Sequence, residues 1–456
     1  MSSRFGSISP ADYHCVPAPN RFGWRSATMK QSRAISSPGP WKGTVQVRAR
    51  LSNGLRVCLL PSSRAPVAST ALFYGAGASR DRPDATGTAH FLEHMMFRGS
   101  RSYGAGEIDA LTQSMGGSNN AFTSHDCALY QFSFASDRWQ TALRLEADRM
   151  RGLLLDPELF EAERSVILEE ISWHEDDPWD SLEQTVFAKL YGGHPYSKPI
   201  LGTHGTVKRI TLERLREFHE RFYTPENAVL VIAGDVGRDA LDKVALEFGH
   251  LSPGAGAPSA APASPVPRAA SRLRRSKGEI SRLLLAMPGP AATEEDFAPL
   301  RLAAGVLGLG RASRLHRKLV DEDPMLSSVS VDVTETLVGG AFLVAAEVLP
   351  GVGESQVDES IRRELEELAE SPPSEEELSR VKRLVFNDWV FSHQQTHQRA
   401  TTAAVAIGLF GDGYLMNQLR ALRRAVPADI RRVSATYLRP ADVGITGWSR
   451  AEESDR

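Results

Sequence analysis

The sequence predicts an α+β protein built from two related halves. Short apolar runs typical of strands are interleaved with longer stretches of helical periodicity, and the same order of strands and helices occurs twice. A stretch rich in Pro, Ala, Ser and Gly, which cannot pack a core, separates the two occurrences. We therefore predict four segments: a flexible polar leader (1–44), a first α+β domain (45–250), a linker (251–278) and a second, homologous α+β domain (279–450).

Composition fits a large globular protein and excludes several classes. The chain has 456 residues, of which 41% are hydrophobic and 24% are charged, so it can bury sizeable cores. Its net charge of −3 does not indicate nucleic acid or an anionic membrane as a partner. Three cysteines are too few for a disulfide framework or a cysteine-rich zinc module. No apolar run reaches the roughly 18–20 residues that a membrane-spanning helix needs.

The leader is polar, rich in Ser, Pro and Arg, and poor in acids. It lacks the apolar run of about 7–15 residues that forms the core of a secretory signal. We therefore expect a flexible extension on a cytoplasmic protein. An organelle transit peptide is the alternative, because such leaders are also rich in Arg and Ser and poor in acids.

The first half opens with a strand pair around an Asn53-Gly54 turn, a residue pair typical of hairpins. A mostly apolar run that follows predicts a buried strand. Alternation and apolar runs place the strands of this half at 45–51, 55–60, 67–74, 128–135 and 228–234. Helical periodicity places its helices at 86–97, 106–115, 139–154, 157–174, 212–222 and 238–248.

After the linker the order of elements recurs. Strands are predicted at 281–287, 327–333 and 340–347, and helices at 297–307, at 314–321, from 357 and from 375. One later helix in each half has an acidic start typical of a cap, with Asp156 before a proline and Ser374 before three glutamates. We interpret the recurrence as an ancient duplication in which the first half alone carries a cluster of ionisable residues.

That cluster begins with a five-residue motif, His-Phe-Leu-Glu-His. Residues three and four apart share one helix face, so His90, Glu93 and His94 project together. Two imidazoles at this spacing can chelate one divalent ion, and a carboxylate beside them can take a proton from a metal-bound water. This is the inverted zincin pattern, HxxEH. Histidines that bind no metal would give the same five residues, so the motif alone leaves both interpretations open.

A catalytic zinc usually has three protein ligands, so a third ligand should lie elsewhere in the chain. The best candidate segment is the helix predicted at 157–174. Glu163 and Glu170 share a face of this helix, and Val166 and Ile167 lie between them. Carboxylates that bracket apolar residues are unusual on a solvated face. An exposed acidic helix is the alternative, and the other glutamates of the segment fit that alternative better.

At these residues the sequence resembles the family of pitrilysin, insulin-degrading enzyme and the mitochondrial processing peptidase. The segment 87–99 looks like the family's HxxEH helix, and the segment 163–170 is similar to its second motif, which ends in the third zinc ligand. The segment 223–235 resembles the end of the family's first domain. The likeness extends from about residue 45 to residue 450.

The resemblance implies a role for each ionisable residue of the cluster. His90, His94 and Glu170 would bind one Zn²⁺ per chain. Glu93 would be the general base that activates a zinc-bound water, and Glu163 would be a catalytic-site carboxylate that supports a ligand from behind. The implied activity is that of a zinc metalloendopeptidase.

The resemblance also implies a substrate strand and a chamber. Residues 116–123 are similar to the family's edge strand, so Asn120, Ala121 and Phe122 would hold the peptide substrate by β-augmentation. Each half would be a mainly antiparallel sheet with helices packed on one face. The halves would enclose a chamber that admits unfolded peptides and excludes folded proteins.

The sequence departs from the family in its second half. Members that work alone carry an Arg and, seven residues later, a Tyr that polarise the scissile carbonyl. Val320 and Ser327 occupy those positions here. We expect a heterodimer in which a homologous subunit, without HxxEH, supplies the Arg and Tyr. The alternative is a shifted alignment, in which Arg314 or Arg317 takes the role.

Two other functions stay open at this stage. The chain could be a non-catalytic zinc-binding scaffold subunit of a larger complex, or a zinc-binding trap that holds peptides without cutting them. Retention of three potential ligands and a base argues against a scaffold, which has no chemical need for them.

Overall fold

The computed structural model describes residues 35–38, 45–254, 265, 269–276 and 278–450. Within these residues the first half forms a seven-stranded sheet in the order β1-β2-β3-β7-β4-β6-β5. Neighbouring strands are antiparallel except for β3 and β7. The strands are β1 (Ile35–Pro38), β2 (Val45–Arg50), β3 (Arg56–Pro61), β4 (Val67–Tyr74), β5 (Ser118–Thr123), β6 (Ala128–Ala135) and β7 (Ala228–Gly234).

Most helices of the first half cover one face of this sheet. They pack into one hydrophobic core with inward side chains of the strands, such as Leu72 and Leu230, which are fully buried. These helices are α1 (Thr88–Met95), α2 (Glu107–Ser114), α3 (Gln140–Arg151), α4 (Pro157–Asp176), α6 (His204–Val207), α7 (Leu212–Phe222) and α8 (Ala240–Phe248). Single 3₁₀ turns lie at Ala78–Arg80, Pro195–Ser197 and Pro225–Asn227.

The second half forms a five-stranded sheet in the order β10-β11-β9-β12-β8, again with one parallel pair, β12 and β8. This order matches β5-β6-β4-β7-β3 of the first sheet strand for strand. The agreement of two topologies on one chain is what a duplication produces. The strands are β8 (Ser271–Ser276), β9 (Ser281–Pro288), β10 (Leu326–Val333), β11 (Ala341–Val348) and β12 (Ile445–Arg450).

The helices of the second half also gather on one face of their sheet, around a second core. They are α9 (Phe297–Gly308), α10 (Arg314–His316), α11 (Glu354–Glu370), α12 (Glu375–Ser392), α14 (Tyr414–Arg424), α15 (Pro427–Tyr437) and α16 (Pro440–Val443). Two π-helical turns, η4 (Arg317–Glu322) and η5 (Ala406–Phe410), follow α10 and α13. An α+β fold of two related halves, each a mainly antiparallel sheet with helices on one face, is therefore confirmed.

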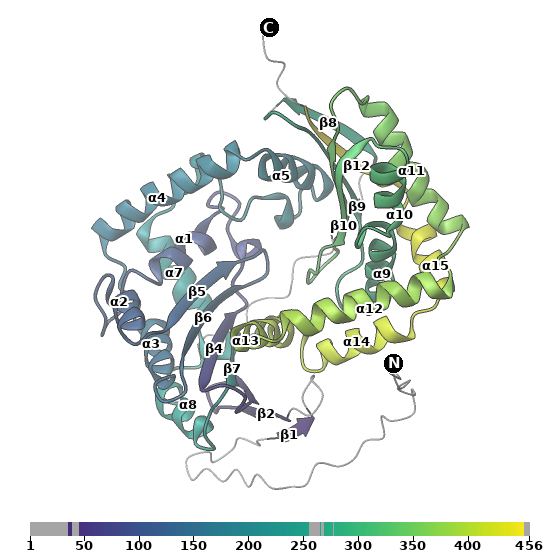
Figure 1. Cartoon of the computed structure of the whole chain (residues 1–456). Coiled ribbons are helices and arrows are strands. Elements are labelled where there is room, and N and C mark those ends of the chain that lie inside the picture. The colour runs from purple at the N-terminus through teal and green to yellow at the C-terminus, as the bar shows by residue number, and fades with distance from the viewer. Residues whose placement is uncertain (1–34, 39–44, 255–264, 266–268, 277, 451–456) are drawn as a thin grey trace.

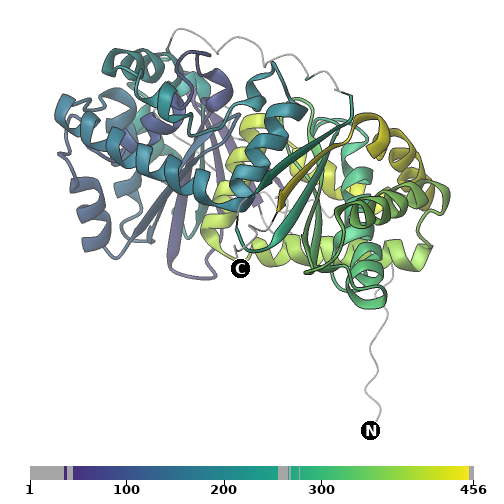
Figure 2. The same cartoon turned by 90° about the horizontal axis from the view of Figure 1, so that it is seen from above.

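The opposite face of each sheet is covered by a helix from the other half, which the sequence did not predict. Helix α5 (Pro178–Leu190) packs Leu182 and Val186 against β9 and β12 of the second sheet. Helix α13 (Thr396–Val405) packs Ala400 and Ala404 against β4 and β7 of the first sheet. Figures 1 and 2 show both helices beside the sheet of the other half. The two halves thus exchange one helix each.

Both sheets begin before the domain boundaries that we predicted. β1 lies inside the segment assigned to the leader, and β8 lies inside the segment assigned to the linker. Arg272 and Arg274, which lie in the predicted linker, form ion pairs with Asp358 and Glu354 of α11. The other residues of the leader and half of the linker lie outside the described residues.

In the described part of the chain, no helix combines the length and the apolarity that crossing a membrane requires.

Candidate metal centre

Helix α1 carries the HxxEH motif and begins at a residue that must be glycine. Gly87 has φ 95°, and a Cβ on it would lie 2.4 Å from the carbonyl oxygen of Leu201. Asp81 accepts hydrogen bonds from the N–H groups of Gly87 (2.7 Å) and Ala89 (3.0 Å), which have no partner inside the helix. The start of α1 is therefore held tightly, up to the residue before His90.

Helix α4 brings the carboxylates to α1. Its N-cap is Asp156, which accepts hydrogen bonds from two backbone N–H groups, and a proline follows at the first helical position, as predicted. Ile167 and Ile171 of α4 are buried in the core under the first sheet. This packing turns Glu163 and Glu170, which share that side of the helix, toward the histidines of α1.

Three side chains converge on one point. Nε2 of His90 lies 3.7 Å from Oε2 of Glu170, and Nε2 of His94 lies 3.4 Å from the same oxygen. One donor atom from each of the three residues lies within 4.8 Å of the other two. Ligands at about 2.0–2.2 Å from a tetrahedral zinc lie roughly 3.4 Å apart, so the two distances to Glu170 fit those that such an ion would need.

A second carboxylate orients one of the histidines. Nδ1 of His94 is 3.0 Å from Oε2 of Glu163, whose side chain is 4% exposed. Arg98, in the bend that follows α1, forms an ion pair with the other oxygen of Glu163. With a proton on Nδ1 and a carboxylate beside it, His94 presents the lone pair of Nε2 to the convergence point, which is the arrangement that supports metal-bound histidines.

The local charges separate the protonation states of the two histidines. Burial and the neighbouring His94 lower the pKa of His90 to about 4, so this imidazole is neutral at physiological pH. Burial also opposes charge on His94, but hydrogen bonds to Glu163 and Glu170 outweigh it and raise the pKa of His94 to about 9. A metal cation at this site would therefore displace a proton on binding.

Glu93 lies beside the donor set and is held by a strand. Oγ1 of Thr123, the last residue of β5, donates a hydrogen bond to Oε2 of Glu93 at 2.5 Å. Burial raises the pKa of Glu93 above its ordinary value, and the bond from Thr123 partly opposes this rise. A carboxyl group with a raised pKa is a better proton acceptor and donor near neutral pH than an ordinary one.

The predicted substrate strand lies at an edge of the first sheet. β5 is the terminal strand of the sheet as described, and it pairs with β6 on one side, with Asn120 opposite Gln131 and Phe122 opposite Leu129. The backbone N–H and C=O groups of its other side are those that an added strand would use. Ala121 packs against the core, whereas Asn120 and Phe122 are exposed.

The second half places no equivalent donors at the two positions that differ from the family. Val320 lies in the π-helical turn η4, and Ser327 is an exposed residue of β10. Arg314 is engaged with α12, because its guanidinium forms an ion pair with Glu377 at 3.0 Å. Arg317 pairs with Glu322 at 3.5 Å.

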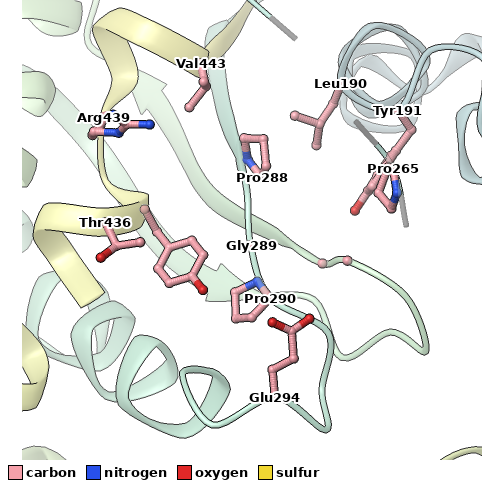
Figure 3. Close-up of a pocket in the computed structure, with 13 residues that line it drawn as sticks. Leu190, Tyr191, Pro265, Pro288, Gly289, Pro290, Glu294, Thr436, Arg439 and Val443 are labelled. Atoms are coloured by element: carbon pink, nitrogen blue, oxygen red, sulfur yellow. The ribbon is translucent and has the colours of Figure 1, made fainter. Parts of the chain in front are cut away.

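Two cavities lie near or between these elements. One, of about 290 Å³, is lined in part by His174, one helical turn beyond Glu170, and by His125 and Phe187. Another, of about 270 Å³, lies between the end of α5 and the second sheet and is lined by Tyr191, Pro288 and other residues (Figure 3). None of the three converging side chains lines this second cavity.

The sequence patterns did not indicate Thr123 and Arg98. Arg98 lies three residues beyond the end of α1, so the helical spacing that groups His90, Glu93 and His94 does not include it. Thr123 left no signal either, since it meets Glu93 through tertiary packing across 30 residues of chain.

Two family models match the chain. The model described as insulinase (peptidase family M16) matches residues 56–204, which include the motif helix and α4, and the model described as the peptidase M16 inactive domain matches residues 209–385. The fold and the donor set thus place the chain in the class of zinc protease homologues. The chain belongs to the insulinase family of peptidases, M16.

Named relatives agree with this assignment, and solved structures share the fold. An uncharacterized zinc protease of Mycobacterium leprae is 33% identical over 67% of this chain and 69% of the relative. A second one, of Streptomyces coelicolor, is 27% identical over 91% of this chain and 92% of the relative. A protease structure from Helicobacter pylori has a TM-score of 0.82 at 24% identity, covering 89% of this chain and 99% of that one. Pitrilysin has a TM-score of 0.79 at 18% identity over 93% of this chain, which spans 47% of pitrilysin.

Proposed function

We propose that the chain is the zinc-bearing subunit of an endopeptidase that cleaves unfolded peptides inside a chamber completed by a second, homologous chain. The observation that carries the proposal is the convergence of His90, His94 and Glu170 with the carboxylate of Glu93 beside them. The printed names of the relatives, zinc proteases, support the same metal and the same reaction class.

Each residue of the site has a chemical task in this proposal. One Zn²⁺ held by His90, His94 and Glu170 would lower the pKa of a water molecule and polarise the scissile carbonyl. Glu93 takes a proton from the attacking water and delivers it to the leaving amine, because burial raises its pKa. Glu163 keeps His94 in the required tautomer.

The substrate would lie along β5. An extended peptide paired with the free edge of this strand, at Asn120, Ala121 and Phe122, places its backbone at a fixed distance from Glu93, which the end of the same strand touches. A strand addition of this kind requires an unfolded substrate, since a folded protein has no free backbone to offer.

The need for a partner rests on what the second half lacks. Neither Val320 nor Ser327 can donate to a carbonyl as the Arg and Tyr would, and Arg314 is occupied by Glu377. This chain also spans about half of pitrilysin. We expect the purified chain to bind zinc but to cleave peptides poorly until a homologous chain with the Arg and Tyr is added. Full turnover at concentrations where the chain is monomeric would contradict the need for a partner.

Hydrolysis of a quenched peptide, measured with and without a chelator, tests the enzymatic function. The Glu93→Gln variant should retain its zinc and lose activity by about 10²–10⁴-fold, whereas Glu169→Gln, an exposed glutamate of α4, should behave as wild type. Unchanged activity of Glu93→Gln would refute the role of Glu93 as the general base. If the wild-type chain with its partner binds zinc and peptide but cleaves nothing, a scaffold or peptide trap replaces the enzyme.

A further inference from the structure

The two faces of strand β5 have different surroundings. Its residues alternate between exposed and half-buried, so Asn119, Ala121 and Thr123 point to the helix side of the sheet. Nδ2 of Asn119 donates to Asp109 of α2 at 2.8 Å, which fixes the strand against the helix layer. The last inward position, Thr123, therefore faces α1.

The hydroxyl of Thr123 meets the carboxylate of the general base directly. Its Oγ1 lies 2.5 Å from Oε2 of Glu93, a short, charge-assisted hydrogen bond. Among the described residues, Thr123 is the hydrogen-bond donor to this carboxylate. Thr123 is also half-buried and β-branched, so few χ1 rotamers are open to it. A stiff donor thus holds one oxygen of a long, flexible side chain.

We propose that Thr123 is a positioning residue for the hydrolytic step. By binding Oε2, its hydroxyl fixes the torsion angles of Glu93 and directs the other oxygen, Oε1, to the water that attacks. The proposal rests on the proposed function of Glu93 as base and adds a residue through which that base acts.

The position of Thr123 in the chain gives this contact a second consequence. Thr123 ends the strand whose edge would bind the substrate, and the two residues before it, Ala121 and Phe122, would pair with the peptide. One strand thereby sets both the register of the substrate and the orientation of the base. A misplacement of a reacting group by about 1 Å can lower the rate about 100-fold. Loss of this shared support should therefore lower kcat more than it changes KM.

Three variants test the role in the zinc-loaded full chain, in the assembly in which it cleaves. Thr123→Val removes the hydroxyl and keeps the shape, and it should lower kcat about 10–100-fold while KM stays within about threefold of wild type. Thr123→Ser keeps the hydroxyl and should restore kcat to within about threefold. Thr70→Val is the matched control, because Thr70 is a buried strand threonine whose hydroxyl has no hydrogen-bond partner among the described residues.

A second measurement needs no activity. In the metal-free chain, unfolding equilibria of Thr123→Val, Glu93→Ala and the double variant form a double-mutant cycle. We expect a coupling of about tenfold in the unfolding equilibrium constant, since hydrogen bonds to charged groups are of that strength. In the zinc-loaded preparations, the Thr123 and Thr70 variants should bind as much zinc as wild type. The zinc content of Glu93→Ala is measured separately.

The outcomes separate the role of Thr123 from the proposed function. A Thr123→Val enzyme with normal kcat, or with a raised KM alone, overturns the positioning role, and additive unfolding effects overturn the hydrogen bond. Failure of Thr123→Ser to restore kcat also overturns the role. If wild type shows no chelator-sensitive hydrolysis, the proposed function and the positioning role both fail, while the metal-free cycle still decides the hydrogen bond.

Discussion

The two halves of the chain share one topology and differ in the helix that follows a central strand. In the first half, β4 leads to α1, which carries His90, Glu93 and His94. In the second half, β9 leads to α9, whose residues are apolar or small apart from Arg301 and which is almost wholly buried. The same place in the same scaffold therefore holds a donor cluster in one copy and a plain hydrophobic helix in the other.

This difference teaches which features of α1 belong to folding and which to chemistry. Because α9 packs well without histidines or glutamates, the scaffold does not need them for stability. Buried ionisable groups destabilise a fold unless they are paired, and α1 carries a buried one, His90, and two half-buried ones, Glu93 and His94. The proposed metal-dependent hydrolysis gives these three side chains a use that folding does not.

Loss of a metal ligand should have the largest effect, and it also tests the contrast between the halves. His94→Ala removes one of the three proposed ligands, so we expect the bound zinc to fall from one equivalent per chain to almost none, measured after gel filtration. If the second half bound zinc as well, one equivalent would persist. His219→Gln, outside the cluster, is the control for general damage.

Shortening a buried side chain of helix α5 should destabilise the second half, whose sheet α5 covers. Leu182→Ala in α5 leaves a cavity against β9 and β12, at an expected cost of about 2–5 kcal/mol. Hydrogen exchange should then rise in the second sheet more than in the first. Ile407→Ala, after α13, should show the reverse pattern. If Leu182→Ala instead raised hydrogen exchange more in the first sheet than in the second, the assignment of α5 to the second sheet would be contradicted.

Acid should loosen the first half before the second. Burial lowers the pKa of His219 in α7 to about 4, below the value of about 6.5 in an unfolded chain. The unfolded state then binds the proton more tightly, so stability is fully present above about pH 6.5 and falls toward pH 4, by at most about 3 kcal/mol. The corresponding residue of α15 is Ser434, which carries no charge.

Stability between pH 4 and pH 7, followed by hydrogen exchange in each half, measures this effect. His219→Gln should flatten the profile of the first sheet and leave the second unchanged. Equal acid sensitivity of both halves in wild type would assign the loss of stability to other groups.

The smallest effects are expected at two corresponding helix caps. Asp156 begins α4 and accepts bonds from two backbone N–H groups, whereas Ser374 begins α12 and accepts a bond from one. Replacement by Ala should cost about 0.5–2 kcal/mol at each, with the larger loss at Asp156, whose charge also favours the helix N-terminus. Chemical denaturation of both variants measures the difference, and an equal loss would show that the charge adds nothing.

Local patterns predicted the fold class and most elements because periodicity and caps are local. The run at 67–74 became β4 with the predicted bounds, and the cap at Asp156 begins α4 as expected. Spacing within each helix grouped His90 with His94 and Glu163 with Glu170, and the family resemblance singled out Glu170 as the third ligand. The structure brings His90, His94 and Glu170 together.

The rest depends on tertiary packing, which one sequence does not display. The exchange of α5 and α13 leaves no trace in the periodicity of either helix, because an apolar stripe shows that a helix is covered but not by what. β8 was missed because an edge strand rich in arginine resembles a linker until its ion pairs with α11 are seen. The bond from Thr123 to Glu93 joins two segments that share no pattern.

The exchange of α5 and α13 makes the chain behave as an internally domain-swapped pair. Each half, taken alone, would expose an apolar sheet face that the other half normally covers. A cut between residues 254 and 269 would therefore leave two fragments that stay together, and either fragment made without the other would aggregate. The halves are held by their mutual cover, so the connecting peptide is free to change in length and composition without separating them.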